Sequence, residues 1–108
     1  MLALALTVAF APLPTNTPVR VYNYPNVDSC ATWTDARRSQ DAGIFEGWIL
    51  GLVTGANLYG RGGGDIAPSV TGPGLFGWVD QYCATRPLTT VTNAGLALVQ
   101  ELHKQRSR

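Results

Sequence analysis

Two cysteines, Cys30 and Cys83, constrain the fold of this chain more than any other residues. In a compartment that oxidises thiols they are expected to form one disulfide, because an isolated exposed thiol would be a liability. A bridge that closes a loop of this size contributes about 4 kcal/mol, a large share of the stability of a small domain. The alternative is a pair of buried free cysteines in a cytosolic protein.

The composition excludes several classes of function. A chain of 108 residues folds as one domain, and its formal net charge of +1 provides no basic surface for DNA, RNA or an anionic membrane. Hydrophobic residues make up 45% of the chain and charged residues 14%, which favours a globular core over disorder. One histidine and two cysteines cannot supply the four ligands of a typical zinc site. We therefore expect a small domain that binds no nucleic acid, metal or other cofactor.

The N-terminus has the composition of an export segment. Residues 2–11 form an apolar run of the length of a signal-peptide core, which is too short to span a membrane. No Lys or Arg precedes this run, and Pro12 follows its best cleavage site. We therefore expect either that Met1 lies inside a longer leader peptide or that the run is a membrane anchor that is not cleaved. The alternative is an ordinary buried strand or helix.

Prolines recur after this run and predict an extended linker. We assign residues 1–11 to a signal-like export segment, 12–27 to a Pro-rich linker and 28–106 to the folded domain. A periplasmic or secreted protein is expected, with no membrane span apart from the leader.

Apolar residues recur at helical spacing in four segments, and no segment alternates convincingly as a strand would. The expected helices run from Cys30 to about Gln40, from about Asp41 to Tyr59, from behind Thr71 to about Thr85, and from Thr90 or Thr92 into the C-terminal tail. N-cap oxygens are offered by Asp28, Ser29 and Thr71. The apolar positions of the last three helices are Ile44, Phe45, Trp48, Ile49, Leu52, Val53 and Ala56, then Leu75, Trp78, Val79 and Tyr82, then Leu88, Val91, Leu98, Val99 and Leu102. The sequence thus predicts an all-α protein, a compact bundle of about four helices joined by one disulfide.

The second helix carries a glycine at every fourth position. The glycine ridge consists of Gly43, Gly47, Gly51 and Gly55. Each glycine costs about 1 kcal/mol relative to alanine in a helix interior, so the repeat predicts that another backbone comes close. The preferred interpretation is that the ridge packs against another helix of the same molecule. The second interpretation is that it forms the interface of a homodimer. A membrane helix is the weakest, because Glu46 and Arg61 limit the uncharged run.

A glycine cluster between Gly60 and Asp65 resembles a phosphate-binding loop in composition alone. It follows a predicted helix instead of a strand, and no Gly-Lys-Ser/Thr sequence completes a P-loop. We expect a flexible connection in which Asp65 anchors a turn and Asn57 caps the glycine-rich turn.

The remaining candidate residues have structural interpretations beside functional ones. Asp80 is expected to pair with Arg37 or Arg38, although it could also be a site residue. The three tryptophans, Trp33, Trp48 and Trp78, are expected to anchor the core and not to bind a ligand. His103 is the only imidazole and lies on a polar stretch, so a Ser-His-Asp triad is not expected. No pair of carboxylates stands out by its spacing as a glycosidase pair would.

Several short motifs together resemble a known group of proteins. They are Cys30-Ala31-Thr32-Trp33, Arg37, Trp48 with Gly51 and Gly55-Ala56-Asn57, Trp78-Val79-Asp80-Gln81-Tyr82-Cys83, and Pro87-Leu88. This pattern resembles the small exported helical proteins of the HdeA/HdeB-like type. It also resembles the related immunity proteins of the Tai class, which neutralise cell-wall amidase toxins of type VI secretion.

The resemblance implies a periplasmic helical bundle, often dimeric, with a Cys30 to Cys83 bridge. The expected function is that of an exported, non-enzymatic protein-binding domain, with immunity against an amidase toxin as its specific version. An acid-stress chaperone that binds client proteins is the alternative. The low content of charged residues favours the first function, because such chaperones are charge-rich. An envelope enzyme is the third possibility. It rests on Asp80 and Asn57, and a deep polar pocket in which Arg37 converges with them would support it.

Overall fold

The computed structural model describes residues 20–23, 28–60 and 62–106, and within these ranges it contains four α-helices and no strand. The helices are α1 (Cys30–Arg38), α2 (Gly43–Tyr59), α3 (Gly72–Ala84) and α4 (Val91–Arg106). The predicted all-α bundle is therefore confirmed. The expected export segment, residues 1–11, and most of the expected linker, residues 12–27, lie outside the described residues.

Side-chain caps fix the start of three helices. Ser29 is the N-cap of α1, and its hydroxyl accepts a hydrogen bond from the backbone N–H of Thr32 at 3.0 Å. Thr71 caps α3 in the same way at 3.3 Å, and Thr90 accepts a comparable bond of 3.0 Å in the first turn of α4. Each hydroxyl satisfies a backbone donor that has no partner within its helix. The predicted caps at Ser29 and Thr71 are confirmed.

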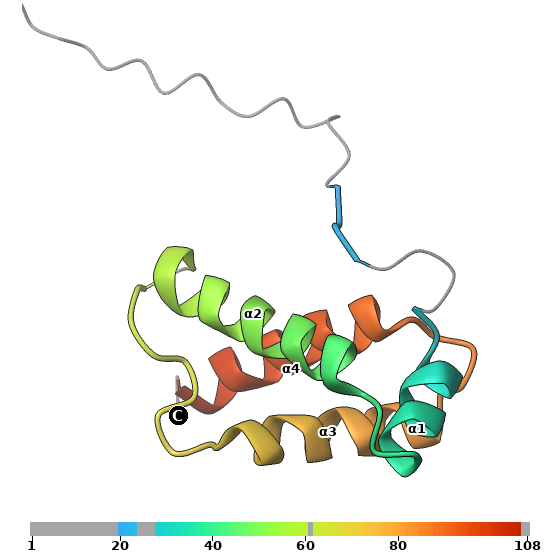
Figure 1. Ribbon diagram of the computed structural model, residues 1–108. Helices are drawn as coiled ribbons and strands as arrows, with labels where there is room; N and C mark the ends of the chain where they lie inside the picture. The colour runs from blue at the N-terminus through green and yellow to red at the C-terminus, as the bar shows by residue number, and fades with distance from the viewer. Residues whose placement is uncertain (1–19, 24–27, 61, 107–108) are drawn as a thin grey trace, which may run out of the picture.

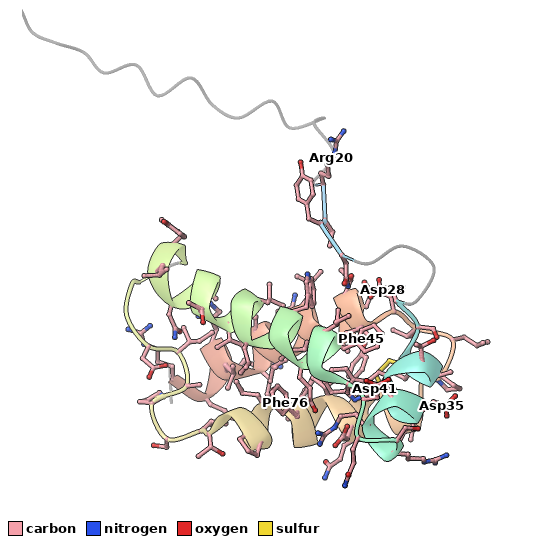
Figure 2. The ribbon with its side chains drawn as sticks, viewed as in Figure 1. Arg20, Asp28, Asp35, Asp41, Phe45 and Phe76 are labelled. Carbon is pink, nitrogen blue, oxygen red and sulfur yellow. A yellow bond between two sulfur atoms is a disulfide. The ribbon has the colours of Figure 1, made fainter. Side chains whose placement is uncertain are left out.

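Helices α2, α3 and α4 lie alongside one another, and α1 covers one end of the bundle (Figure 1). α3 contacts both α1 and α4, and it also contacts α2. The core lies between the four helices and consists of Cys30, Trp33, Ile49, Val53, Ile66, Ala67, Leu75, Val79, Cys83, Val91, Ala94, Leu98 and Leu102. Phe45 and Phe76, labelled in Figure 2, pack against it from α2 and α3.

The disulfide joins the first residue of α1 to the last turn of α3. Cys30 and Cys83 are both buried, and their Cα atoms are 4.8 Å apart. The bridge is the yellow bond beside α1 in Figure 2. The predicted disulfide is confirmed, and the described residues contain no free cysteine. The bridge therefore holds the short helix α1 against the longer α3.

A second connection fastens the start of α1 to the start of α4. Ser29 and Thr90 form an isolated antiparallel bridge, and the N–H of Val91 donates to the carbonyl of Asp28 at 2.7 Å. The Asp28 carboxylate also accepts bonds from the backbone N–H and the hydroxyl of Thr92, at 3.2 and 2.9 Å. Asp28 was expected to cap the first helix, but its side chain instead holds the start of the last one.

The glycine ridge of α2 packs against nothing within the described residues. A Cβ built at any of its members, Gly51 and Gly55 included, would meet no atom within 4 Å. The preferred expectation, that the ridge lets another helix of this molecule come close, is therefore wrong. Close approach occurs at Gly95 of α4, where a Cβ would lie 2.7 Å from Cδ2 of Leu52 and 2.9 Å from Cζ3 of Trp48.

The reason lies in which side of α2 faces the core. Ile49 and Val53 define the buried side, and a helical period of 3.6 residues puts the glycines on the opposite side. Ile44 was expected in the core but is 59% exposed, because it shares the outward side with the glycines. Leu88 was expected to pack along the last helix but precedes α4 in a turn and is 97% exposed.

Candidate functional site

A network of charged side chains connects three helices at the α1 end of the bundle. Arg37 on α1 donates from Nε and Nη2 to the two carboxylate oxygens of Asp80 on α3, at 2.9 and 2.8 Å. Its Nη1 donates to the carboxylate of Glu46 on α2 at 2.7 Å. The indole N–H of Trp33 completes the network with a 2.8 Å bond to Asp80. Of the two expected partners of Asp80, the structure selects Arg37.

The network stabilises the charged forms of Arg37 and Asp80. Hydrogen bonds to Asp80 raise the pKa of Arg37 above its usual range, against the effect of burial, and the bond to Glu46 adds to the rise. Burial alone would raise the pKa of Asp80, but the hydrogen bonds from Arg37 and Trp33 outweigh burial and lower it. Asp80 is therefore held as a carboxylate that accepts hydrogen bonds, a state that suits a structural ion pair better than a general acid.

The guanidinium of Arg37 also lies close to two aromatic rings. Its Cζ is 5.5 Å from the ring centroid of Phe76 and 5.9 Å from that of Trp33. Such cation–π contacts further restrict the side chain. Asp80 and Arg37, two residues on which an enzyme would depend, are thus engaged in contacts between helices.

Asn57, the third residue of the enzyme hypothesis, lies apart from this network and holds the α2–α3 connection. Its Oδ1 accepts a bond from the N–H of Ile66 at 2.9 Å, so it secures the far end of the loop. Asp65 accepts from the N–H of Ala67 at 2.8 Å, which confirms the predicted turn anchor. The connection is also secured by Arg106, which donates to the carbonyl of Gly63 at 2.7 Å. The glycines at 62–64 have positive φ angles, which glycine adopts readily.

The three tryptophans have different environments. Trp33 is fully buried, as expected of a core anchor. Trp48 and Trp78 are half-buried at the border of the core. Trp48 donates from its indole nitrogen to the carbonyl of Tyr22 at 2.9 Å, and with Tyr22, Asn23 and Ile44 it lines an open hollow of about 360 Å³. Among the described residues, no Asp, Glu, Lys, Arg or His lines this hollow.

The end of α3 and the turn that follows it carry aromatic, cationic and aliphatic side chains. We call this region the α3–α4 turn surface, and it consists of Trp78 and Tyr82 on α3 and of Arg86 and Leu88 in the turn. The rings of Trp78 and Tyr82 are stacked with centroids 5.5 Å apart, and Cζ of Arg86 lies 4.3 Å from the Tyr82 centroid. Leu88 follows Arg86 in the turn with its side chain in solvent. Aromatic and arginine side chains of this kind dominate binding energy at protein interfaces.

The backbone around Leu88 is held on both sides. The N–H of Arg86 donates to the carbonyl of Cys83, and the N–H of Thr89 donates to that of Arg86, both at 3.1 Å. The N–H of Cys30 donates to the carbonyl of Thr89 at 2.7 Å, which attaches the turn to α1 beside the disulfide. The turn thus presents a large apolar side chain on a fixed backbone.

The sequence placed Trp78 and Tyr82 on the third helix, but it did not predict the contact of Arg86 with Tyr82 or the exposure of Leu88. The available signal was Pro87, because an apolar residue directly after a helix-ending proline lies in a turn and not on a helix face. The described residues contain no group of His, Cys, Asp or Glu that could hold a metal ion. Among the same residues, no helix is long and apolar enough to cross a bilayer.

The geometry therefore separates an internal ion-pair network from an exposed surface. The network around Arg37 joins α1, α2 and α3, whereas Leu88 of the α3–α4 turn surface is exposed to solvent. The chain matches no known protein family, curated protein or solved structure.

Proposed function

We propose that this protein is an exported, non-enzymatic protein-binding domain, and specifically an immunity protein that blocks a cell-wall amidase toxin. The observation that carries the proposal is Leu88, which is 97% exposed on a turn whose backbone is hydrogen-bonded on both sides. An apolar side chain in solvent gives nothing to the stability of the monomer, but it gains free energy when a partner's pocket receives it. A fixed backbone lowers the entropy lost on binding.

The neighbouring side chains support a protein partner. Arg86 is held over Tyr82 and donates to the carbonyl of that residue at 3.3 Å, so its charge has a defined position two residues before Leu88 in the chain. A partner that fits offers an apolar pocket with a carboxylate at its rim. The buried disulfide supports an oxidising compartment such as the periplasm.

The test uses a purified peptidoglycan amidase toxin encoded beside this gene, with peptidoglycan hydrolysis as the readout. We expect the wild type to inhibit the enzyme at a stoichiometric ratio. Leu88→Asp should weaken inhibition at least about tenfold, because a charge cannot enter an apolar pocket without a large desolvation penalty. Its melting temperature should stay unchanged, since the side chain has no intramolecular contact to lose.

The matched control is Gln81→Asp, which adds the same charge at an exposed position of α3. This variant should inhibit like the wild type. Absence of inhibition by the wild type would exclude the immunity function. Equal inhibition by wild type and Leu88→Asp would exclude the turn surface as the toxin-binding site, while the proposed immunity function would stand.

A second candidate function is that of an acid-stress chaperone. It is favoured because carboxylates on α2 and α3 hold Arg37 of α1. Asp80 and Glu46 both bind Arg37, and protonation of Asp80 in acid would weaken the attachment of α1 to α3. This function predicts that the protein exposes apolar surface and suppresses aggregation of a denatured client at about pH 2 to 3. A protein that stays native and inert there does not have it.

A further inference from the structure

Three of the four helices are fastened to one another without α2. The disulfide joins α1 to the last turn of α3. Near the other end of α1, Arg37 donates two hydrogen bonds to the Asp80 carboxylate on α3. The carboxylate of Asp28, just before α1, accepts two bonds from Thr92 at the start of α4. We call α1, α3 and α4 together the frame.

Within the described residues, α2 is attached to the frame and to its own connecting loop by one polar contact near each end. Glu46 in its first turn binds Arg37, and the two side chains are 26% and 30% exposed. Asn57 in its last turn accepts a hydrogen bond from the N–H of Ile66. Ion pairs that are partly open to solvent contribute little to stability, so these two contacts hold α2 weakly.

The apolar attachment of α2 is also weaker than that of the other long helices. Of its 17 residues, only Ile49 and Val53 are buried. By contrast, α3 buries three of its 13 residues and α4 five of its 16. The indole bond of Trp48 goes to Tyr22 in the segment 20–23, so it does not fasten α2 to the frame. Few buried side chains mean a low free energy of local opening.

The sequence of α2 also gives the helix little stability of its own. Gly47, Gly51 and Gly55 lie in its interior, where only proline is less favourable than glycine. A Cβ at any of these positions would meet no atom within 4 Å, so their small size brings no packing in return. α2 therefore depends on the frame for its helical form.

Both connections of α2 contain residues with left-handed backbone angles. Gln40, between α1 and α2, has a φ of 56°. Between α2 and α3, the glycines at 62, 63 and 64 have φ angles of 86°, 59° and 81°. Glycine changes between left-handed and right-handed angles at little cost, and the left-handed state is unfavourable for glutamine. Residues that can change their backbone angles in this way are suited to hinges.

The disulfide leaves α2 free to move without opening the frame. α2 lies inside the loop that Cys30 and Cys83 close, which has a sequence separation of 53. The segment that contains α2 starts after Arg38 of α1 and ends before Gly72 of α3, so the frame holds it at both ends. α2 can therefore leave the frame and return while α1 stays attached to α3.

We propose that α2 is a lid that opens from the frame by local unfolding, while α1, α3 and α4 stay together. The opening uncovers the side of α4 around Gly95, against which Leu52 and Trp48 pack in the closed state. Neither Leu88 nor Arg86 takes part, so the motion is independent of the toxin-binding function and of its test.

Native-state hydrogen exchange of the full chain in increasing urea tests the proposal. The interior amides of α2 should exchange roughly a hundredfold faster than the slowest amides of α3 and α4, after correction for intrinsic rates. Their exchange should also depend less on urea, because opening α2 exposes only part of the surface that global unfolding exposes. Equal protection and equal urea dependence in α2, α3 and α4 would overturn the proposal.

Two matched variants each neutralise one carboxylate that binds Arg37. Asp80→Asn weakens a contact that stays intact when the lid opens, so protection should fall about fivefold to thirtyfold in α3 and α4 and stay unchanged in α2. Glu46→Gln weakens a contact that the opening itself breaks, so protection should fall about twofold to fivefold in all three helices. If Asp80→Asn lowers protection in α2 as much as in α3, the lid does not open separately and the proposal fails.

The variant Cys30→Ala/Cys83→Ala tests the frame from its other end. Without the bridge the frame should open about as easily as the lid, so the protection of α3 and α4 should fall close to that of α2. A difference in protection as large as that in the wild type would show that the disulfide does not hold the frame closed, which also overturns the proposal.

Discussion

Replacing glycine by alanine at two places should change stability in opposite directions. In the interior of α2, Gly47 and Gly51 face solvent, and a Cβ at either position meets nothing within 4 Å. The double variant Gly47→Ala/Gly51→Ala gains the helix propensity of alanine at both positions without any clash. At about 1 kcal/mol per position, the free energy of unfolding should rise by about 2 kcal/mol.

Gly95 on α4 is the matched control. A Cβ there would lie 2.7 Å from Leu52, 2.9 Å from Trp48 and 3.3 Å from Ile49, so the side chains of α2 would have to move. Overpacking of this kind costs about 1–3 kcal/mol, which outweighs the propensity gain of about 1 kcal/mol. Gly95→Ala should therefore lower the free energy of unfolding by about 1 kcal/mol.

Thermal and urea unfolding measure both effects. A change of 1 kcal/mol shifts the melting temperature of a domain this small by about 4–8 °C. The double variant should melt roughly 10 °C above the wild type and Gly95→Ala several degrees below it. A loss of stability in the double variant would mean that the α2 glycines are packed, which would contradict the open space around Gly47 and Gly51.

Two further predictions concern the ion-pair network and the disulfide. Asp80→Asn should lower the free energy of unfolding at pH 7 by about 1–2 kcal/mol, a loss limited by the 37% exposure of the Asp80 side chain. Because the pKa of Asp80 is lowered by folding, the unfolded chain takes up its proton first as the pH falls below about 4. The wild type should thus lose this stability between about pH 4 and the lower pKa of Asp80 in the folded state. In urea titrations, the free energy of unfolding of Asp80→Asn should change less with pH over this range. If the two proteins showed the same pH dependence, the ion-pair role of Asp80 would be contradicted. Cys30→Ala/Cys83→Ala should lower the free energy of unfolding by about 4 kcal/mol in thermal melts, because the bridge closes a loop with a sequence separation of 53. A loss below about 1 kcal/mol would contradict the stabilising role of the disulfide.

Local patterns in the sequence predicted the helices and the bridge well. Ser29 and Thr71 marked helix starts because their hydroxyls satisfy backbone donors within the next turn. The cysteines predicted their own pairing because the chain has only two. Asp80 and Arg37 were foreseen as partners from their charges, although the choice between Arg37 and Arg38 required the structure.

The sequence did not predict which side of a helix faces the core and which side faces solvent. The glycine ridge indicated close packing, but Gly51 faces solvent while the contact falls on Gly95 of another helix. Ile44 follows the apolar period of α2 yet lies on its outward side, since two large side chains, Ile49 and Val53, already fill the core there. Periodicity alone cannot distinguish an exposed apolar side from a buried one.

The fastening of α1 has a consequence for the order in which the protein folds. Synthesis produces α1 first, but its start is tied to the start of α4 through Asp28 and Thr92 and to the end of α3 through Cys83. These contacts join residues far apart in the sequence, so they form only after long loops have closed. The first helix therefore has no complete docking surface until Thr92 has emerged. A ribosome that still holds the last helix would therefore leave α1 without its contacts to α4, and Cys30 would stay more accessible until the rest of the chain arrives.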